Sequence, residues 1–275
     1  MGKVSIFGGR NRWREFKQQC VQLITEALLL LRERSDLIKN EWTLNRLLYQ
    51  CIVDANYNLG LDFLPSSEAK NPPHPDDKQK AESEDNIPDF SWPLMDPTAN
   101  YKHWNRNFVL ECKRLGIDKS RELTQEYVTK GILRFFLEDE GYGKGCEAGA
   151  MAAYIHDMEL DTLLAKVNSY IAKHKPSIPF LTTPSDGWQT QGVSYLAHAF
   201  QRSFIPTSFF LQHFWVDMRD CHFLPSSIDT EASSSEEQEL APDKKSKSQK
   251  QKSSKGKKAT SNKTYQMAFP IDEKQ

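Results

Sequence analysis

The chain lacks any run of about 18 consecutive apolar residues, the length that a helix needs to cross a membrane. Its first residues, MGKVSIFGGRNRW, also lack the apolar segment and cleavage pattern of a secretory signal peptide. These two absences argue against a membrane protein and a secreted protein. We therefore expect a soluble, cytoplasmic chain that makes no contact with a membrane.

Cysteine is scarce and scattered along the chain. No C-x-x-C pair occurs, and the histidines of the aromatic-rich segments have no ligand spacing. These patterns argue against a disulfide framework and a structural zinc site, so we expect reduced thiols that lie mostly in the core. The five cysteines are Cys20, Cys51, Cys112, Cys146 and Cys221.

Strong motifs for nucleotide binding and for a serine nucleophile are also missing. The glycine-rich segment GYGKG, residues 141–145, does not fit G-x-x-x-x-G-K-[ST] and follows a predicted helix instead of a strand. G-x-S-x-G does not occur. These absences exclude a typical phosphate-binding loop and a typical α/β-hydrolase nucleophile.

Charge is nearly balanced over the whole chain but unevenly distributed. The sequence contains 36 Lys and Arg against 37 Asp and Glu, a formal net charge of −1. A globally basic nucleic-acid footprint is therefore absent. Residues 97–134 nevertheless contain eight basic and four acidic side chains, and residues 231–275 contain ten lysines and seven acids.

What is present is an alternation of helical and strand-like patterns, typical of an α/β domain. The composition, 38% hydrophobic and 11% aromatic, is sufficient for a substantial core. The predicted helices are residues 12–34, 41–58, 120–139 and 158–173. The predicted strands are residues 87–92, 107–115, 192–203 and 207–220, and residues 148–158 form a central strand or, alternatively, a helix.

The composition also predicts the domain boundaries. Residues 1–230 should form one domain, interrupted by a Pro-rich charged insertion at 65–86. Residues 231–263 should be a disordered linker, first acidic and then Lys-rich. Residues 264–275 include the apolar stretch TYQMAFPI, which is expected to dock on the body or on a partner.

The stretch NFVLECKRLG, residues 107–116, predicts a buried strand that ends in charges. Side chains alternate along a strand, so Glu111 and Lys113 share one face with Val109. The opposite face holds Phe108, Leu110 and Cys112. Both faces begin apolar, and burying charge without a partner or a metal ion is costly. The alternative is a Glu–Lys ion pair on a half-exposed strand.

A second motif, Pro88-Asp89-Phe90, places an aspartate 22 residues before Glu111, at the preceding predicted strand. With Pro88-Asp89 and Glu111-Cys112-Lys113 the sequence resembles the PD-(D/E)XK nuclease superfamily, the restriction-endonuclease-like proteins. The order helix, strand, strand, helix, strand is similar to the core of that family. The likeness covers roughly residues 41–156 and implies a restriction-endonuclease-like core with a mixed central sheet flanked by helices.

The resemblance implies a role for each matched residue. Asp89, Glu111 and the backbone carbonyl of Cys112 would hold Mg²⁺, which Mn²⁺ can replace. The metal would polarise a phosphodiester and activate water, while Lys113 orients the water or offsets charge on the phosphate. Family members often add a carboxylate from the preceding helix, for which Glu41 is the candidate. Alternatively, Glu41 only stabilises the positive end of its helix.

Basic and aromatic side chains around these motifs are candidates for nucleic-acid contacts. The loop NYKHWNR supplies several of them, although a packed loop with a core tryptophan is an equal alternative. For Lys130 we favour a surface ion pair with Glu126. The candidate residues are Lys102, Trp104, Arg106, Arg114, Lys130 and Arg134.

The expected function is a Mg²⁺-dependent DNA endonuclease of bacterial restriction or anti-phage-defence type, with RNA as an alternative substrate. Double-strand cleavage would favour a homodimer. The rival is a non-catalytic subunit that binds DNA or a protein partner, such as a DNA-handling ATPase. The acidic body, a poor DNA binder by itself, favours the rival.

Overall fold

The computed structural model describes residues 8–68, 87–95, 105–118, 121–138, 141–203 and 208–225. All of these lie in one compact unit, Met1–Glu231. Most of the predicted insertion at 65–86, the linker at 231–263 and the segment 264–275 lie outside the described residues. Lys102 and Trp104 also lie outside them.

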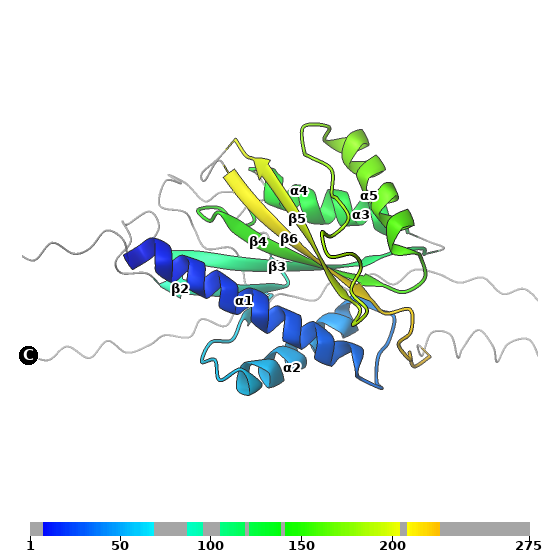
Figure 1. Cartoon of the computed structure of the whole chain (residues 1–275), viewed down its shortest axis with the longest axis horizontal. Coiled ribbons are helices and arrows are strands. Elements are labelled where there is room, and N and C mark those ends of the chain that lie inside the picture. Colours follow the sequence, from blue (N-terminus) through cyan, green and yellow to red (C-terminus); the bar gives the residue numbers. More distant parts are fainter. Residues whose placement is uncertain are drawn as a thin grey trace, which may run out of the picture. The chain divides into compact units, whose positions relative to one another are not determined.

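A mixed sheet of six strands, in the order β1-β2-β3-β4-β6-β5, forms the centre of this unit (Figure 1). β3 and β4 are parallel, as are β4 and β6, whereas the outer pairs β1–β2, β2–β3 and β5–β6 are antiparallel. The strands are β1 (Ser66–Ser67), β2 (Phe90–Met95), β3 (Asn105–Leu115), β4 (Ala148–Ile155), β5 (Val193–Gln201) and β6 (Ser208–Asp217).

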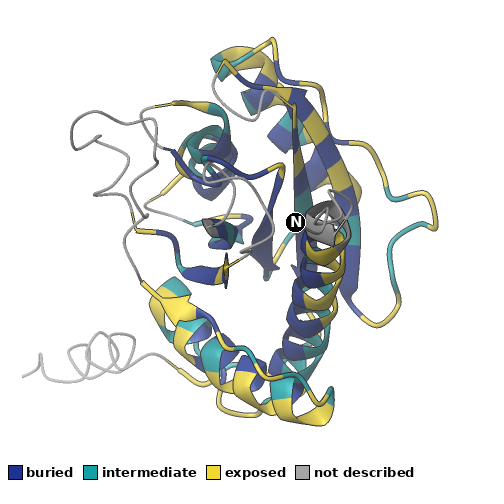
Figure 2. Cartoon of the chain, turned by 90° about the vertical axis from the view of Figure 1, so that its left-hand side faces the viewer, coloured by how far each residue is buried: buried dark blue, intermediate teal, exposed yellow. Residues whose placement is uncertain are grey.

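Helices cover both faces of the sheet. The helices α1 (Gly8–Arg32) and α2 (Glu41–Asn58) pack on one face and bury their apolar stripes in one core cluster. On the other face, a second cluster joins the sheet to the helical segment 123–136 and to α5 (Leu160–His174). Figure 2 shows these buried positions on the inner sides of the helices and along the strands.

The mixed α/β class with helices on both faces is confirmed. From α2 to β4 the structure adds the two-residue strand β1 to the predicted order helix, strand, strand, helix, strand. Residues 148–155 form a strand buried at every position. The two strands predicted in residues 192–220 are confirmed as an antiparallel pair. In the described part of the chain, no helix is long and apolar enough to span a membrane.

The single helix predicted for residues 120–139 is wrong in detail. The structure instead has α3 (Leu123–Tyr127), a π-helical turn η2 (Val128–Ile132) and α4 (Leu133–Phe136). A π turn contains an extra residue, which changes the direction of the side chains that follow it. Gly131 lies within this turn, and a Cβ there would stand 2.3 Å from the terminal methyl carbon of Met151.

β3 is a central strand with both faces covered, as its sequence predicts. Phe108, Leu110 and Cys112 belong to the cluster under α1 and α2, and Val109 belongs to the opposite cluster. The charged end of the strand therefore lies between two apolar layers.

A buried arginine donates hydrogen bonds to the backbone of the glycine-rich segment at residues 141–146. Arg202, only 4% exposed, donates to the carbonyl oxygens of Cys146 at 2.7 Å and Gly143 at 3.3 Å. Its guanidinium also lies 4.1 Å from the ring centroid of Phe209. These contacts hold the segment that carries Tyr142, a residue of the candidate site described below.

Replacing Arg202 by methionine should lower the free energy of unfolding by about 2–4 kcal/mol, because several buried carbonyl groups would lose a charged donor. Urea unfolding followed by circular dichroism measures the change. The matched control is Arg121→Met, since the Arg121 side chain is 46% exposed and its pair with Glu126 should contribute less than about 1 kcal/mol. Equal losses in the two variants would contradict this role.

Candidate metal and catalytic site

The end of β3 has an open edge, because β2 begins with the pair Phe90–Leu110 and does not continue beside the later residues. Carboxylates take the place of a strand partner there. The backbone N–H of Cys112 donates to Asp89 Oδ2 at 2.7 Å. The backbone N–H of Arg114 donates to Glu41 Oε2 at 3.1 Å. Two of the predicted acidic residues thus complete the hydrogen bonding of β3.

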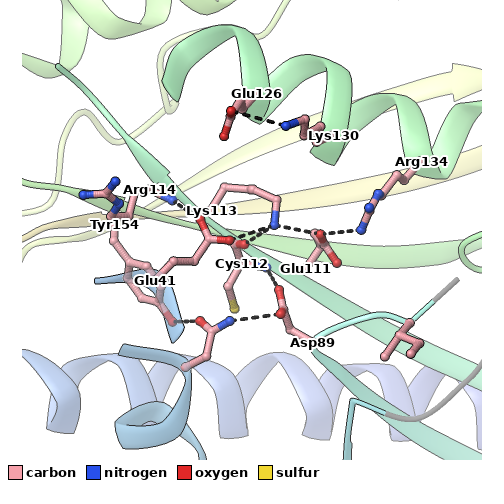
Figure 3. A network of polar contacts seen from close by, with 12 residues as sticks. Glu41, Asp89, Glu111, Cys112, Lys113, Arg114, Glu126, Lys130, Arg134 and Tyr154 are labelled. Carbon is pink, nitrogen blue, oxygen red and sulfur yellow. Dashed lines mark hydrogen bonds and ion pairs between the residues drawn. The ribbon is translucent and has the colours of Figure 1, made fainter. Parts of the chain in front are cut away.

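The Lys113 ammonium lies at the centre of this cluster (Figure 3). Its Nζ is 2.9 Å from Glu111 Oε1 and 3.1 Å from Glu41 Oε1. It also donates to the carbonyl oxygen of Cys112 at 2.8 Å. Three oxygens, from two strand residues and one helix residue, therefore converge on one cation.

Glu111 is the most deeply buried acid of the cluster, with 1% of its surface exposed. Arg134 Nη1 donates to its Oε1 at 3.0 Å, and the same nitrogen donates to the Tyr142 hydroxyl at 2.9 Å. Tyr142 in turn donates to the Ile87 carbonyl at 2.7 Å. The other oxygen, Glu111 Oε2, is buried without a hydrogen-bond partner among the described residues.

A chain of hydrogen bonds from the sheet orients Asp89. The Tyr154 hydroxyl donates to Asn45 Oδ1 at 3.0 Å, and Asn45 Nδ2 donates to Asp89 Oδ1 at 3.0 Å. The tyrosine donor fixes which side of the Asn45 amide faces Asp89. Both oxygens of Asp89 therefore accept hydrogen bonds.

Charge among the described residues of the cluster is not balanced. Glu41, Asp89 and Glu111 are three carboxylates, while Lys113 and Arg134 are two cations. Burial, followed by the negative charge of Glu111, raises the pKa of Asp89 to about 7. Removing Asp89 from water thus favours its protonated form near neutral pH.

The pKa values of Glu111 and Lys113 are also raised, and each shift has a clear cause. Burial raises the pKa of Glu111, although Lys113 and Arg134 oppose this effect. Burial opposes the charge of Lys113, but the carboxylates of Glu111, Asp89 and Glu41 outweigh it and raise the Lys113 pKa. We conclude that Lys113 is a charged ammonium and that Asp89 is readily neutralised near neutral pH.

The donor set fits a divalent cation of the Mg²⁺ type. Carboxylate and backbone carbonyl oxygens are its preferred ligands, and the buried Glu111 Oε2 offers an acceptor without a donor. Within the described ranges, however, no three His, Cys, Asp or Glu side chains form a ready ligand group. The Lys113 ammonium contacts Glu41, Glu111 and the Cys112 carbonyl, three of the oxygen donors available here.

The structure gathers all the residues predicted for catalysis and metal binding. Glu41 contributes more than a favourable interaction with its helix end, since Asn40 is the N-cap and Glu41 reaches Lys113. Sequence reasoning missed Asn45 and Tyr142 as members of the cluster. It included Arg134 only as a nucleic-acid contact, whereas Arg134 pairs with Glu111.

The other predicted nucleic-acid contacts are more dispersed. Arg106 is buried with its guanidinium carbon 5.4 Å from the ring centroid of Trp13, which favours a packing role over the predicted phosphate contact. Arg114 donates to Asp118 at 2.8 Å and to the Lys39 carbonyl at 3.2 Å. Lys130 is exposed and pairs with Glu126 at 3.3 Å, the surface pair expected from the sequence.

Two grooves differ in their relation to the cluster. One of about 620 Å³ is lined by Arg32, Gln191 and Asp220 among others, and Arg32 donates to both of the other two. It includes none of the predicted site residues. A groove of about 440 Å³ is lined in part by Asp89.

No protein-family model, curated protein or solved structure matches this chain.

Proposed function

We propose that the protein is a Mg²⁺-dependent nuclease that hydrolyses phosphodiester bonds of DNA, built on a restriction-endonuclease-like core. The observation that carries the proposal is the convergence of Asp89, Glu111, Lys113 and the Cys112 carbonyl at the open end of β3. The resemblance of Pro88-Asp89 and Glu111-Cys112-Lys113 to the PD-(D/E)XK pattern supports it. Burying charge at a strand end is costly, and groups with strongly shifted pKa values, such as Asp89, cluster at functional sites.

Asp89, Glu111 and the Cys112 carbonyl would hold the metal, with Glu41 as an additional ligand. When bound, Mg²⁺ would supply Lewis-acid activation of the phosphodiester and of water. Lys113 has a flexible stem, so its ammonium can exchange the Cys112 carbonyl for a phosphate oxygen and offset developing negative charge. Arg134 and Tyr142 would keep Glu111 in place, and Asn45 would orient Asp89.

The cellular role we propose is bacterial restriction or anti-phage defence in the cytoplasm. The locally basic sequence around the site favours a nucleic-acid substrate, with Lys102, Trp104, Arg114 and Lys130 as candidate contacts. The same catalytic residues would serve for cleavage of RNA. A homodimer would supply the two active sites that double-strand cleavage needs.

Incubation of the purified chain with supercoiled plasmid, linear duplex, single-stranded DNA and RNA, each with Mg²⁺, Mn²⁺ or EDTA, tests this function. The proposal expects cleavage of DNA that EDTA abolishes. Absence of cleavage with every substrate and both metals would contradict nuclease activity.

Metal affinity should depend on pH through Asp89. Its pKa is raised to about 7, so below that pH a metal ion must displace a proton. Calorimetric titration should find Mn²⁺ affinity falling about tenfold for each pH unit below about 7 and levelling off above it. Asp89→Asn should bind Mn²⁺ much more weakly than the unmodified chain at pH 8, where Asp89 is charged. An affinity that is constant between pH 6 and 8 in the unmodified chain would contradict the role of Asp89.

A specific observation favours a second function, a non-catalytic subunit that binds DNA or a protein partner such as an ATPase. The Lys113 ammonium already bonds to Glu111, Glu41 and the Cys112 carbonyl, so the cluster can serve as a structural end to β3. Absence of Mn²⁺ binding by calorimetry would favour this alternative.

A further inference from the structure

The groove beside Asp89 has one wall made by the outward side of α2. This wall consists of residues three or four positions apart, a spacing that places their side chains on one side of the helix. They are Trp42, Asn45, Arg46, Tyr49 and Gln50. Ser67 and Glu68 line it from the segment of β1, and Asp89 lies between the two walls. The groove has a volume of about 440 Å³, within the usual range of small-ligand sites.

An exposed tryptophan dominates the helical wall. Trp42 is 62% exposed, and the guanidinium carbon of Arg46 lies 5.9 Å from its ring centroid. Trp42 directly follows Glu41, whose carboxylate contacts Lys113 and the backbone of Arg114. Trp42 is thus the immediate chain neighbour of a member of the cluster at the end of β3.

We propose that this groove binds an unpaired nucleotide of the nucleic-acid substrate, with its base stacked on Trp42. The inference rests on the proposed function, because it assigns the groove to the same substrate. It goes further in naming an unpaired strand, rather than intact duplex, as the form that the site prefers.

The chemistry of the lining supports this occupant. Base stacking on an aromatic side chain contributes about 1–3 kcal/mol and tolerates any base. Arg46 can contact a phosphate, and the Gln50 amide can pair with a base edge. Glu68 and Asp89 would repel a phosphate without a cation, so the phosphate belongs at the metal-binding end and the base against Trp42.

The test uses the full chain and a fluorescein-labelled single strand of about 12 nucleotides, compared with a hairpin duplex of the same composition. Fluorescence anisotropy is measured with Ca²⁺ in place of Mg²⁺, and a gel verifies that the oligonucleotide stays intact. The variants are Trp42→Ala, Trp42→Phe and Tyr57→Ala. Tyr57 is the matched control, because it is an 85% exposed aromatic residue of the same helix outside the groove.

We expect the single strand to bind more tightly than the hairpin. Trp42→Ala should weaken single-strand binding about 5- to 100-fold, while Trp42→Phe and Tyr57→Ala should change it less than about threefold. Three results would each overturn the inference: no single-strand binding by the unmodified chain, equal losses in Trp42→Ala and Tyr57→Ala, or a preference for the hairpin.

The two proposals can fail separately. Metal-dependent cleavage with a Trp42→Ala affinity equal to that of the unmodified chain would overturn the nucleotide groove and leave the nuclease intact. Trp42-dependent binding without cleavage under any metal condition would retain the groove and overturn the nuclease.

Discussion

Replacing Asp89 by asparagine should reduce metal-dependent DNA cleavage on the order of a thousandfold. The substitution retains the shape of the side chain and an oxygen that can accept from the Cys112 N–H, but it removes the negative charge that a metal requires. Plasmid nicking at saturating Mg²⁺ measures the loss. Thermal unfolding of the same samples separates a lost site from a lost fold.

Asp54→Asn is the matched control for this prediction, since Asp54 is an exposed aspartate of α2. Its cleavage rate should stay within about twofold of the unmodified chain. If Asp89→Asn and Asp54→Asn both retain full activity, Asp89 is not a metal ligand and the proposed nuclease site is wrong.

Replacing Lys113 by methionine should abolish cleavage and also lower the free energy of unfolding by about 3–5 kcal/mol. Its ammonium contacts the nearly inaccessible Glu111, whose carboxylate would lose one of its two cations. A buried charge with reduced compensation is among the most destabilising single changes. Urea unfolding at pH 8 measures the stability.

The double variant Lys113→Met with Glu111→Gln distinguishes the structural from the catalytic contribution. Removing both charges should restore at least about half of the lost stability, because no extra buried carboxylate remains. Cleavage should stay absent. A double variant as unstable as Lys113→Met alone would contradict the pairing, and a single variant that cleaves normally would contradict the catalytic role.

The charged end of β3 could be predicted because its signal is local. A strand alternates its faces, and residues 107–116 show two apolar faces followed by Glu111 and Lys113, so a buried cluster followed from the pattern. Glu41 came into consideration through the resemblance, since family members often add a carboxylate from the preceding helix, with an interaction at its helix end as the alternative. The helix α2 begins at that residue, as predicted.

The partners of these residues could not be predicted, because their roles arise from tertiary contacts. Asn45 is one polar residue among several in α2. Only the folded chain shows that it accepts from Tyr154 and donates to Asp89, and so orients Asp89. Arg134 was predicted only as a nucleic-acid contact, within a single regular helix over residues 120–139. The π turn η2 lies between α3 and α4 and changes the direction of the following side chains, and Arg134 reaches Glu111.

The most direct test of the central claim is a crystal structure of the chain soaked with Mn²⁺, with anomalous scattering data. We expect an anomalous peak bounded by Asp89, Glu111 and the Cys112 carbonyl, with the Lys113 ammonium moved off that carbonyl. Full Mn²⁺ occupancy elsewhere, with Lys113 still bonded to Cys112 and no peak between the two acids, would contradict it.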